Sequence, residues 1–110
     1  MADRMPDAPL DITLSGTGEH RIVMLKGELD AYTSPMLRER MLELIDDGAR
    51  ELVLDLSGIE LIDSTGLGVL VGVLKRVLQH DGALELRSLR PAARRVLDIT
   101  GLDRVFTIVD

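Results

Sequence analysis

The stretch that decides the fold is ELVLDLSGIELIDSTGLGVL, residues 51–70. Its first part, Glu51–Leu56, is a short and nearly continuous apolar run, which predicts a central β-strand buried on both faces. The leucines and valines between Thr65 and Gln79 recur at helical spacing, which predicts a helix over those residues. A buried strand that leads through a short loop into a helix is typical of an α/β protein.

Strand and helix patterns alternate on both sides of this stretch. Leu10–Leu14 and His20–Leu29 flank a turn-forming segment and predict a β-hairpin. Ser34 precedes a proline, so we expect it to be the N-cap of a helix that runs to about Asp46. The remaining predicted elements are a strand over Ala83–Leu86, a helix over Pro91–Ile99 with Ala92, Val96, Leu97 and Ile99 pointing inward, and an edge strand over Val105–Val109. This order predicts a mixed β-sheet of four to five strands covered by three to four helices.

The composition indicates one domain with an aliphatic core. The chain has 110 residues, of which 45% are hydrophobic and only 2% aromatic. This length suits a single domain, which we expect to span residues 10–110 after a flexible N-terminal tail of residues 1–9. The formal net charge of −6 disfavours direct binding to nucleic acid, because phosphate groups would be repelled.

Other features narrow the class further. The chain lacks cysteine, and its two histidines, His20 and His80, stand alone, so we expect no metal site and no cofactor. No N-terminal signal peptide is evident. The apolar run Leu67–Leu74 is much shorter than the ~20 residues that cross a bilayer. We therefore expect a cytoplasmic protein that does not enter the membrane.

Ser64 stands where the predicted strand leads into the predicted helix, and this position permits two interpretations. Its hydroxyl could simply cap the helix, as serine commonly does. Alternatively, it could accept a phosphate, since the free N–H groups and the dipole of a helix start favour an anion. A phosphate would add about 1.5–2 negative charges beside Asp63 and Asp30, which would change binding without unfolding the domain.

Four segments then suggest a family. They are GELD at residues 27–30, DLSG at 55–58, IDSTGLGVL at 62–70 and ITGL at 99–102. In this order and spacing the chain resembles the anti-sigma-factor antagonists of the STAS domain family, from Leu10 onward. The run from Asp63 to Gly68 is the most specific part of the resemblance.

The resemblance implies a regulatory binding protein rather than an enzyme. Ser64 matches the serine that is phosphorylated in the family. The implied partners are an anti-sigma factor that is itself an ATP-dependent serine kinase, and a PP2C-type phosphatase that removes the phosphate. The unphosphorylated antagonist would bind the anti-sigma factor and free a sigma factor. Asp30 matches a family aspartate near the switch serine, so we expect it in the partner-binding surface.

The helix after Ser64 adds further candidates to that surface. Gly66, Gly68 and Gly72 leave a slim side on the helix, either for close packing within the domain or for close approach of the partner, with Val69 and Val73 as apolar contacts. Asp63 is expected to orient or recognise Ser64, and Thr65 is a less favoured phosphate acceptor.

Two alternatives remain at the level of sequence. STAS domains also serve as subunits of lipid-transport ABC complexes and as parts of other STAS assemblies, and such a chain would associate stably with those partners. A nucleotide hydrolase is the alternative from another class. The chain lacks a phosphate-loop lysine, a metal cluster and a nucleophile–base pair, which disfavours an enzyme.

Overall fold

The structure, a computed structural model, describes residues 9–110; most of the predicted N-terminal tail, residues 1–8, lies outside the described residues. The order of strands and α-helices is the predicted one, and a short 3₁₀ helix that was not predicted precedes the last strand. In chain order, the elements are β1 (Leu10–Thr17), β2 (His20–Leu29), α1 (Ser34–Asp46), β3 (Glu51–Ile62), α2 (Ser64–Gln79), β4 (Ala83–Arg87), α3 (Pro91–Thr100), the short 3₁₀ helix η1 (Leu102–Arg104) and β5 (Thr107–Val109).

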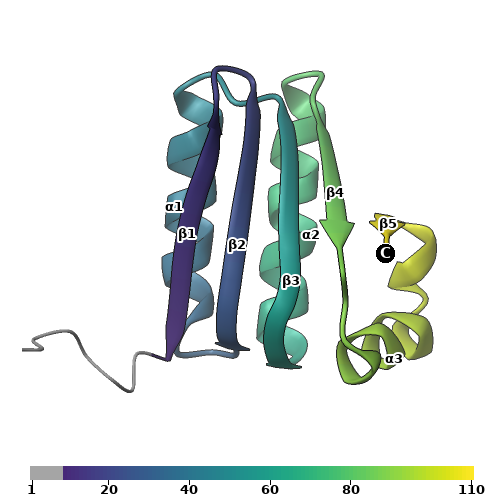
Figure 1. Ribbon diagram of the computed structural model, residues 1–110. Helices are drawn as coiled ribbons and strands as arrows, with labels where there is room; N and C mark the ends of the chain where they lie inside the picture. The colour runs from purple at the N-terminus through teal and green to yellow at the C-terminus, as the bar shows by residue number, and fades with distance from the viewer. Residues whose placement is uncertain (1–8) are drawn as a thin grey trace, which may run out of the picture.

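The strands form one mixed five-stranded sheet in the order β1-β2-β3-β4-β5 (Figure 1). The hairpin strands β1 and β2 pair antiparallel, and every other neighbouring pair is parallel. The α/β fold class predicted from the sequence is confirmed. The parallel pairing places the carboxyl ends of β2 and β3 at the same edge of the sheet, the lower edge in Figure 1.

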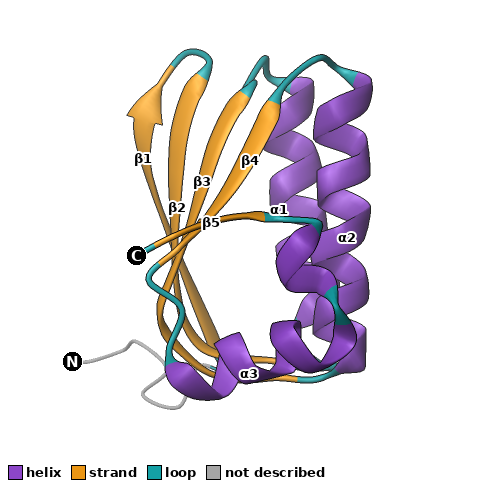
Figure 2. Ribbon diagram, turned by 90° about the vertical axis from the view of Figure 1, so that its right-hand side faces the viewer, coloured by secondary structure: helices purple, strands orange, loops and turns teal. Residues whose placement is uncertain are grey.

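Helices α1 and α2 cover one face of the sheet, and no helix or strand of residues 9–110 covers the other face (Figure 2). The buried side chains of β3 therefore lie on the helix side, at Leu52, Leu54 and Leu56, whereas Val53 and Asp55 on the alternate side are only half-buried. The prediction that this strand is buried on both faces was wrong, although β3 is the central strand. The strand is also longer than its apolar run and continues to Ile62.

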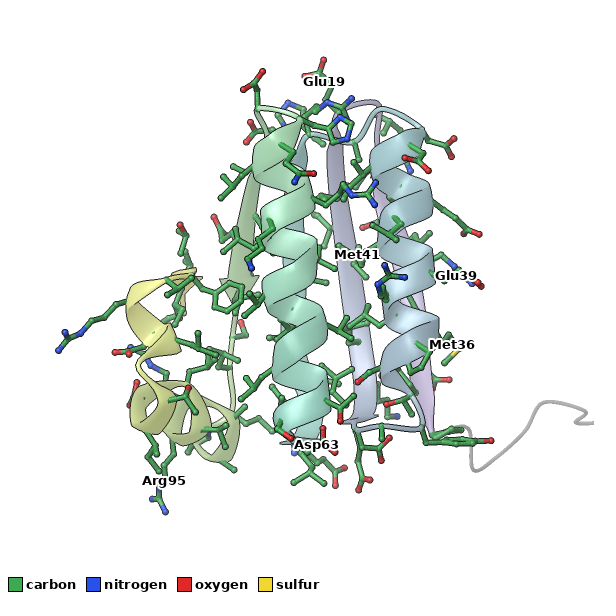
Figure 3. All side chains as sticks on the ribbon, turned by 180° about the vertical axis from the view of Figure 1, so that it is seen from behind. Glu19, Met36, Glu39, Met41, Asp63 and Arg95 are labelled. Atoms are coloured by element: carbon green, nitrogen blue, oxygen red, sulfur yellow. The ribbon has the colours of Figure 1, made fainter. Side chains whose placement is uncertain are left out.

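The core between sheet and helices is aliphatic, as the composition requires. Leu37, Met41 and Ile45 from α1 pack with Leu70 and Val77 from α2 against the leucines and valines of the sheet. Met41 is fully buried, and Figure 3 shows it between the two helices.

Two local predictions need correction. The N-cap of α1 is Thr33, whereas Ser34 lies inside the helix with its hydroxyl buried and unpartnered among the described residues. In α3, Ala93 and Leu97 are buried, whereas Ala92 is exposed and Ile99 is 78% exposed. This helix packs only its inner face against the end of the sheet, so the outward Ala92 and Ile99 meet no neighbouring element.

Candidate functional site

The loops after β2 and β3 lie side by side at the lower edge of the sheet. Leu29 is in register with Ile62, and the backbone N–H of Asp63 donates to the carbonyl of Leu29 at 3.0 Å. The chain thereby brings Asp30, at the end of β2, to the same edge as the start of α2. Asp30 and Asp63 are 33 positions apart in the sequence, and the parallel pairing of β2 and β3 brings them to the same edge of the sheet.

The start of α2 is capped by Asp63 and not by Ser64. The Asp63 carboxylate accepts the backbone N–H of Gly66 at 3.0 Å, and the Asp63 carbonyl accepts that of Leu67 at 3.0 Å. The interpretation of Ser64 as the helix cap was therefore wrong. Ser64 is the first residue of the helix and is exposed, as is Thr65.

The backbone N–H groups of Ser64 and Thr65 find no acceptor among residues 9–110. They are free helix-start donors at the positive end of the α2 dipole. An oxyanion attached to the Ser64 side chain would lie close to these donors, and the cap made by Asp63 would not have to be broken.

The loop between β2 and α1 is organised around Asp30. One oxygen of its carboxylate, Oδ1, accepts the backbone N–H of Tyr32 at 2.9 Å, the backbone N–H of Thr33 at 3.0 Å and the Thr33 hydroxyl at 3.2 Å. The hydrogen bond from the Thr33 backbone is the main cause that lowers the pKa of Asp30 below its ordinary value of 3.8; partial desolvation opposes it, and the bond from Tyr32 reinforces it. Asp30 is thus a carboxylate that holds its own loop in shape.

This end of the molecule carries acidic side chains without basic neighbours in the same segments. Residues 27–37 and 51–74 contain no lysine, arginine or histidine. Glu28 and Glu60 are exposed here, and Asp30 and Asp63 are half-buried. Basic side chains approach from neighbouring segments: Arg38 lines the same hollow as Thr65, and the guanidinium of Arg90 donates to the Ser57 carbonyl at 2.7 Å. A further negative group on Ser64 would add its charge directly beside the carboxylate of Asp63.

A shallow groove of about 510 Å³ runs between α1 and α2 on the outer side of the helices. Thr65 and Val69 line it from α2, and Pro35, Leu42 and Asp46 are among the residues that line it from α1. The groove begins one residue after Ser64, so a protein that docks on Ser64 can also reach this groove. Figure 3 looks onto these helices, with Asp63 at the lower end of α2.

The structure does not bring every residue predicted for the partner surface to the exterior. Val73 is 1% exposed and packs in the core, and Gly66 is buried where a Cβ atom would come within 2.8 Å of the Leu29 carbonyl oxygen. Neither can contact a partner in this conformation, because both face the sheet side of α2. Gly68 and Gly72 face open space, since a Cβ atom added at either position would have no atom of the described residues within 4 Å.

Three exposed apolar side chains near this end were not singled out in the sequence. Tyr32 lies in the β2–α1 loop, Met36 in the first turn of α1 and Leu61 near the end of β3. For Tyr32, the sequence offered one signal of a role, an aromatic residue between the end of a strand and the start of a helix. That its ring is exposed depends on the geometry of the loop, which the sequence does not give.

Two further observations concern the described part of the chain. Among residues 9–110 no group of three or more histidine, cysteine or carboxylate side chains is arranged to hold a metal ion. Within the same residues, none of the helices has the length and apolar character needed to span a bilayer.

Comparison with known proteins identifies the family. The sequence matches the STAS domain over residues 11–110. The chain belongs to the STAS domain family. Its resemblance to the anti-sigma-factor antagonists of that family, first seen in the four sequence segments, is confirmed by the relatives below.

Two relatives and one solved structure illustrate the similarity. An anti-sigma-B factor antagonist of Bacillus subtilis is 42% identical over 86 residues, which cover 78% of each chain. An anti-sigma F factor antagonist of Paenibacillus polymyxa is 40% identical over 90 residues, which cover 81% of this STAS protein and 77% of the relative. The crystal structure of an anti-sigma factor antagonist from Mycobacterium paratuberculosis superimposes with a TM-score of 0.82 at 28% identity, covering 96% of this chain and 88% of the other. All three are named for antagonism of a regulatory protein and not for a catalysed reaction.

Proposed function

We propose that this STAS protein is an anti-sigma-factor antagonist whose binding is switched off by phosphorylation of Ser64. The observation that carries the proposal is the exposed Ser64 hydroxyl at the first position of α2, beside two free backbone N–H groups. The identity of 42% to an anti-sigma-B factor antagonist supports the partner class.

In its unphosphorylated form the protein binds an anti-sigma factor and thereby frees a sigma factor. The docking surface comprises the exposed part of the lower edge and the adjoining groove. Its proposed contact residues are Asp63, Ser64, Thr65, Gly68, Val69 and Gly72, and Asp30 belongs to this surface through the β2–α1 loop that its carboxylate holds in shape.

The anti-sigma factor is proposed to be an ATP-dependent serine kinase that phosphorylates its own antagonist. Transfer requires the terminal phosphate of ATP to lie against the Ser64 hydroxyl, so the product phosphate faces the phosphates of the remaining ADP. Both are negative, and the new phosphate must also be desolvated at the interface. These costs favour dissociation, while the free N–H groups of Ser64 and Thr65 leave the modified helix start intact.

The remaining components follow from this cycle. A PP2C-type phosphatase restores the hydroxyl, and the use of ATP places the cycle in the cytoplasm. The antagonist itself needs neither nucleic acid nor a membrane, and its net charge of −6 is consistent with a protein surface as its target.

The experiment combines binding and phosphorylation. The purified protein is incubated with ATP and candidate anti-sigma factors, and intact-mass and fragment-ion spectra locate the phosphate. We expect a single phosphate on Ser64 and none in Ser64→Ala, whereas the neighbouring control Thr65→Ala is still phosphorylated. Equal phosphorylation of Ser64→Ala, or failure of the unmodified protein to bind any such factor, would contradict the proposal.

A further inference from the structure

Tyr32 is the most exposed of the large hydrophobic side chains among the described residues. It is the single tyrosine of the chain, and 81% of its surface is accessible to solvent. Exposed aromatic rings near a functional site commonly mark a protein–protein contact, because they bury a large area when a partner binds.

The backbone that carries Tyr32 is held rigidly although the ring is free. Its N–H is bonded to the Asp30 carboxylate at 2.9 Å. The next residue, Thr33, donates both its N–H and its hydroxyl to the same carboxylate, and its hydroxyl also donates to the Glu28 carbonyl at 2.7 Å. The N–H of Ser34 then donates to the Asp30 carbonyl at 2.9 Å. A loop fixed by this many bonds loses little entropy on binding, so a side chain on it is pre-organised for recognition.

The surroundings of Tyr32 define the chemistry of its partner. The exposed Glu28 and the half-buried Asp30 precede it on the chain, and Met36, 42% exposed, follows one turn into α1. Figure 3 shows Met36 on the outer side of α1, away from α2. An exposed ring on a loop that follows the exposed carboxylate of Glu28 is matched by an apolar pocket whose rim carries lysine or arginine, and arginine also stacks favourably on an aromatic face.

We propose that Tyr32 is the anchor by which this protein binds its anti-sigma factor, and that Asp30 is a positioning residue that holds Tyr32 in place. The inference rests on the proposed function and adds to it the partner's surface: an apolar pocket with a cationic rim, next to the kinase site that receives Ser64. Every hydrogen bond that the Asp30 carboxylate accepts stays within its own loop, so its contribution to binding passes through the loop.

The test measures dissociation constants for the anti-sigma factor that binds the parent protein. We expect Tyr32→Ala to bind at least about 30-fold more weakly. Tyr32→Phe, which keeps the ring, stays within about threefold of the parent. Leu78→Ala is the matched control, because Leu78 is also an exposed apolar residue, 56% accessible, but lies at the opposite end of α2. Tyr32→Ala binding within about threefold of the parent, or Tyr32→Phe binding as weakly as Tyr32→Ala, would overturn the anchor.

A double-mutant cycle tests the role of Asp30 separately. If Asp30 acts through Tyr32, Asp30→Ala weakens binding about tenfold in the parent and by less than about twofold in the Tyr32→Ala background. Equal effects in both backgrounds would show a direct role and overturn the positioning assignment. Asp30→Asn, which retains one carbonyl-type acceptor, serves the same cycle if Asp30→Ala does not fold.

The same samples separate this inference from the proposed function. Suppose that Tyr32→Ala binds normally, while Ser64 is still phosphorylated and phosphorylation still ends binding. This result would refute Tyr32 as the anchor and leave the proposed function unaffected. If no phosphate is found on Ser64, the proposed phosphorylation switch is refuted.

Discussion

The three glycines of α2 give a sharp prediction because the structure places them in opposite surroundings. Gly66 faces β2, where a Cβ atom would lie 2.9 Å from the Leu29 Cβ and 2.8 Å from its carbonyl oxygen. Gly68 and Gly72 face open space. All three lie within one helix, so the same substitution to alanine compares close packing with free surface.

The magnitudes follow from two opposing effects. Alanine favours a helix over glycine by about 1 kcal/mol, and at Gly68 and Gly72 nothing opposes this gain. At Gly66 the new carbon is about 0.6 Å closer to Leu29 than an ordinary carbon–carbon contact. Overpacking of this kind costs roughly 1–3 kcal/mol. Because the obstacle at Gly66 includes backbone, which yields little, we expect a cost of about 2–3 kcal/mol there, from which the helix gain of about 1 kcal/mol is subtracted. We expect Gly66→Ala to lose roughly 1–2 kcal/mol net and Gly72→Ala to gain about 1 kcal/mol.

Thermal unfolding followed by circular dichroism measures this difference. For a domain of this size about 1 kcal/mol corresponds to about 4 °C in Tm, so the two variants should move in opposite directions by about 4 °C or more. A rise in Tm for Gly66→Ala would refute the packing of the helix start on Leu29. The affinity for the partner should also change. If the partner approaches the slim side of α2, Gly68→Ala and Gly72→Ala weaken its binding although they stabilise the fold. Stabilised variants that bind like the parent would remove these two glycines from the interface.

Two further predictions concern the carboxylates of the lower edge. The lowered pKa of Asp30 means that its ionised form stabilises the fold above its ordinary value of 3.8, and that this stabilisation is lost as the pH falls through the lower pKa of the folded state. Urea unfolding from about pH 7 to about pH 3 should therefore show the parent more stable than Asp30→Asn near neutrality, with the difference shrinking below about pH 4; a constant difference at every pH would contradict this. Asp63→Ala removes the α2 cap and should cost about 1 kcal/mol in urea unfolding, whereas Ser64→Ala, at the next position, should change stability by less than about 0.5 kcal/mol. A larger loss for Ser64→Ala than for Asp63→Ala would restore Ser64 as the cap.

The order of strands and helices could be predicted from the sequence because period-two and helical spacings differ clearly in this chain. The coverage of the sheet could not. An apolar run such as Leu52–Leu56 indicates that a strand is buried, but it does not indicate whether helices cover one face of the sheet or both. The first two of the three parallel crossovers, β2-α1-β3 and β3-α2-β4, step in the same direction across the sheet, and crossovers of one hand then place α1 and α2 on one face. That conclusion requires the strand order, which the sequence does not state.

Some residues of the candidate site could likewise be predicted from the sequence, and others could not. Ser64 and Asp63 could be found from the sequence, because strand-to-helix junctions are visible there. The alternative interpretation of Ser64 as the helix cap was one position off, because Asp63 is the cap and serine, threonine and aspartate cap helices with similar strength. Val73 could not be separated from Val69 because α2 is apolar around most of its surface, and only its packing decides which valine faces the core. Tyr32 required the loop geometry, in which Asp30 fixes the backbone and leaves the ring in solvent.

The central claim is that phosphorylation of Ser64 ends binding through local charge while the fold stays unchanged. The most direct measurement compares the dissociation constants of the phosphorylated and unphosphorylated protein for the same ADP-bound anti-sigma factor, with urea unfolding of both forms. We expect binding at least about 100-fold weaker after phosphorylation, because like charges forced together at an interface cost several kcal/mol. The free energies of unfolding should agree within about 0.5 kcal/mol. Equal affinities of the two forms, or a phosphorylated protein that has lost its folded structure, would contradict the account.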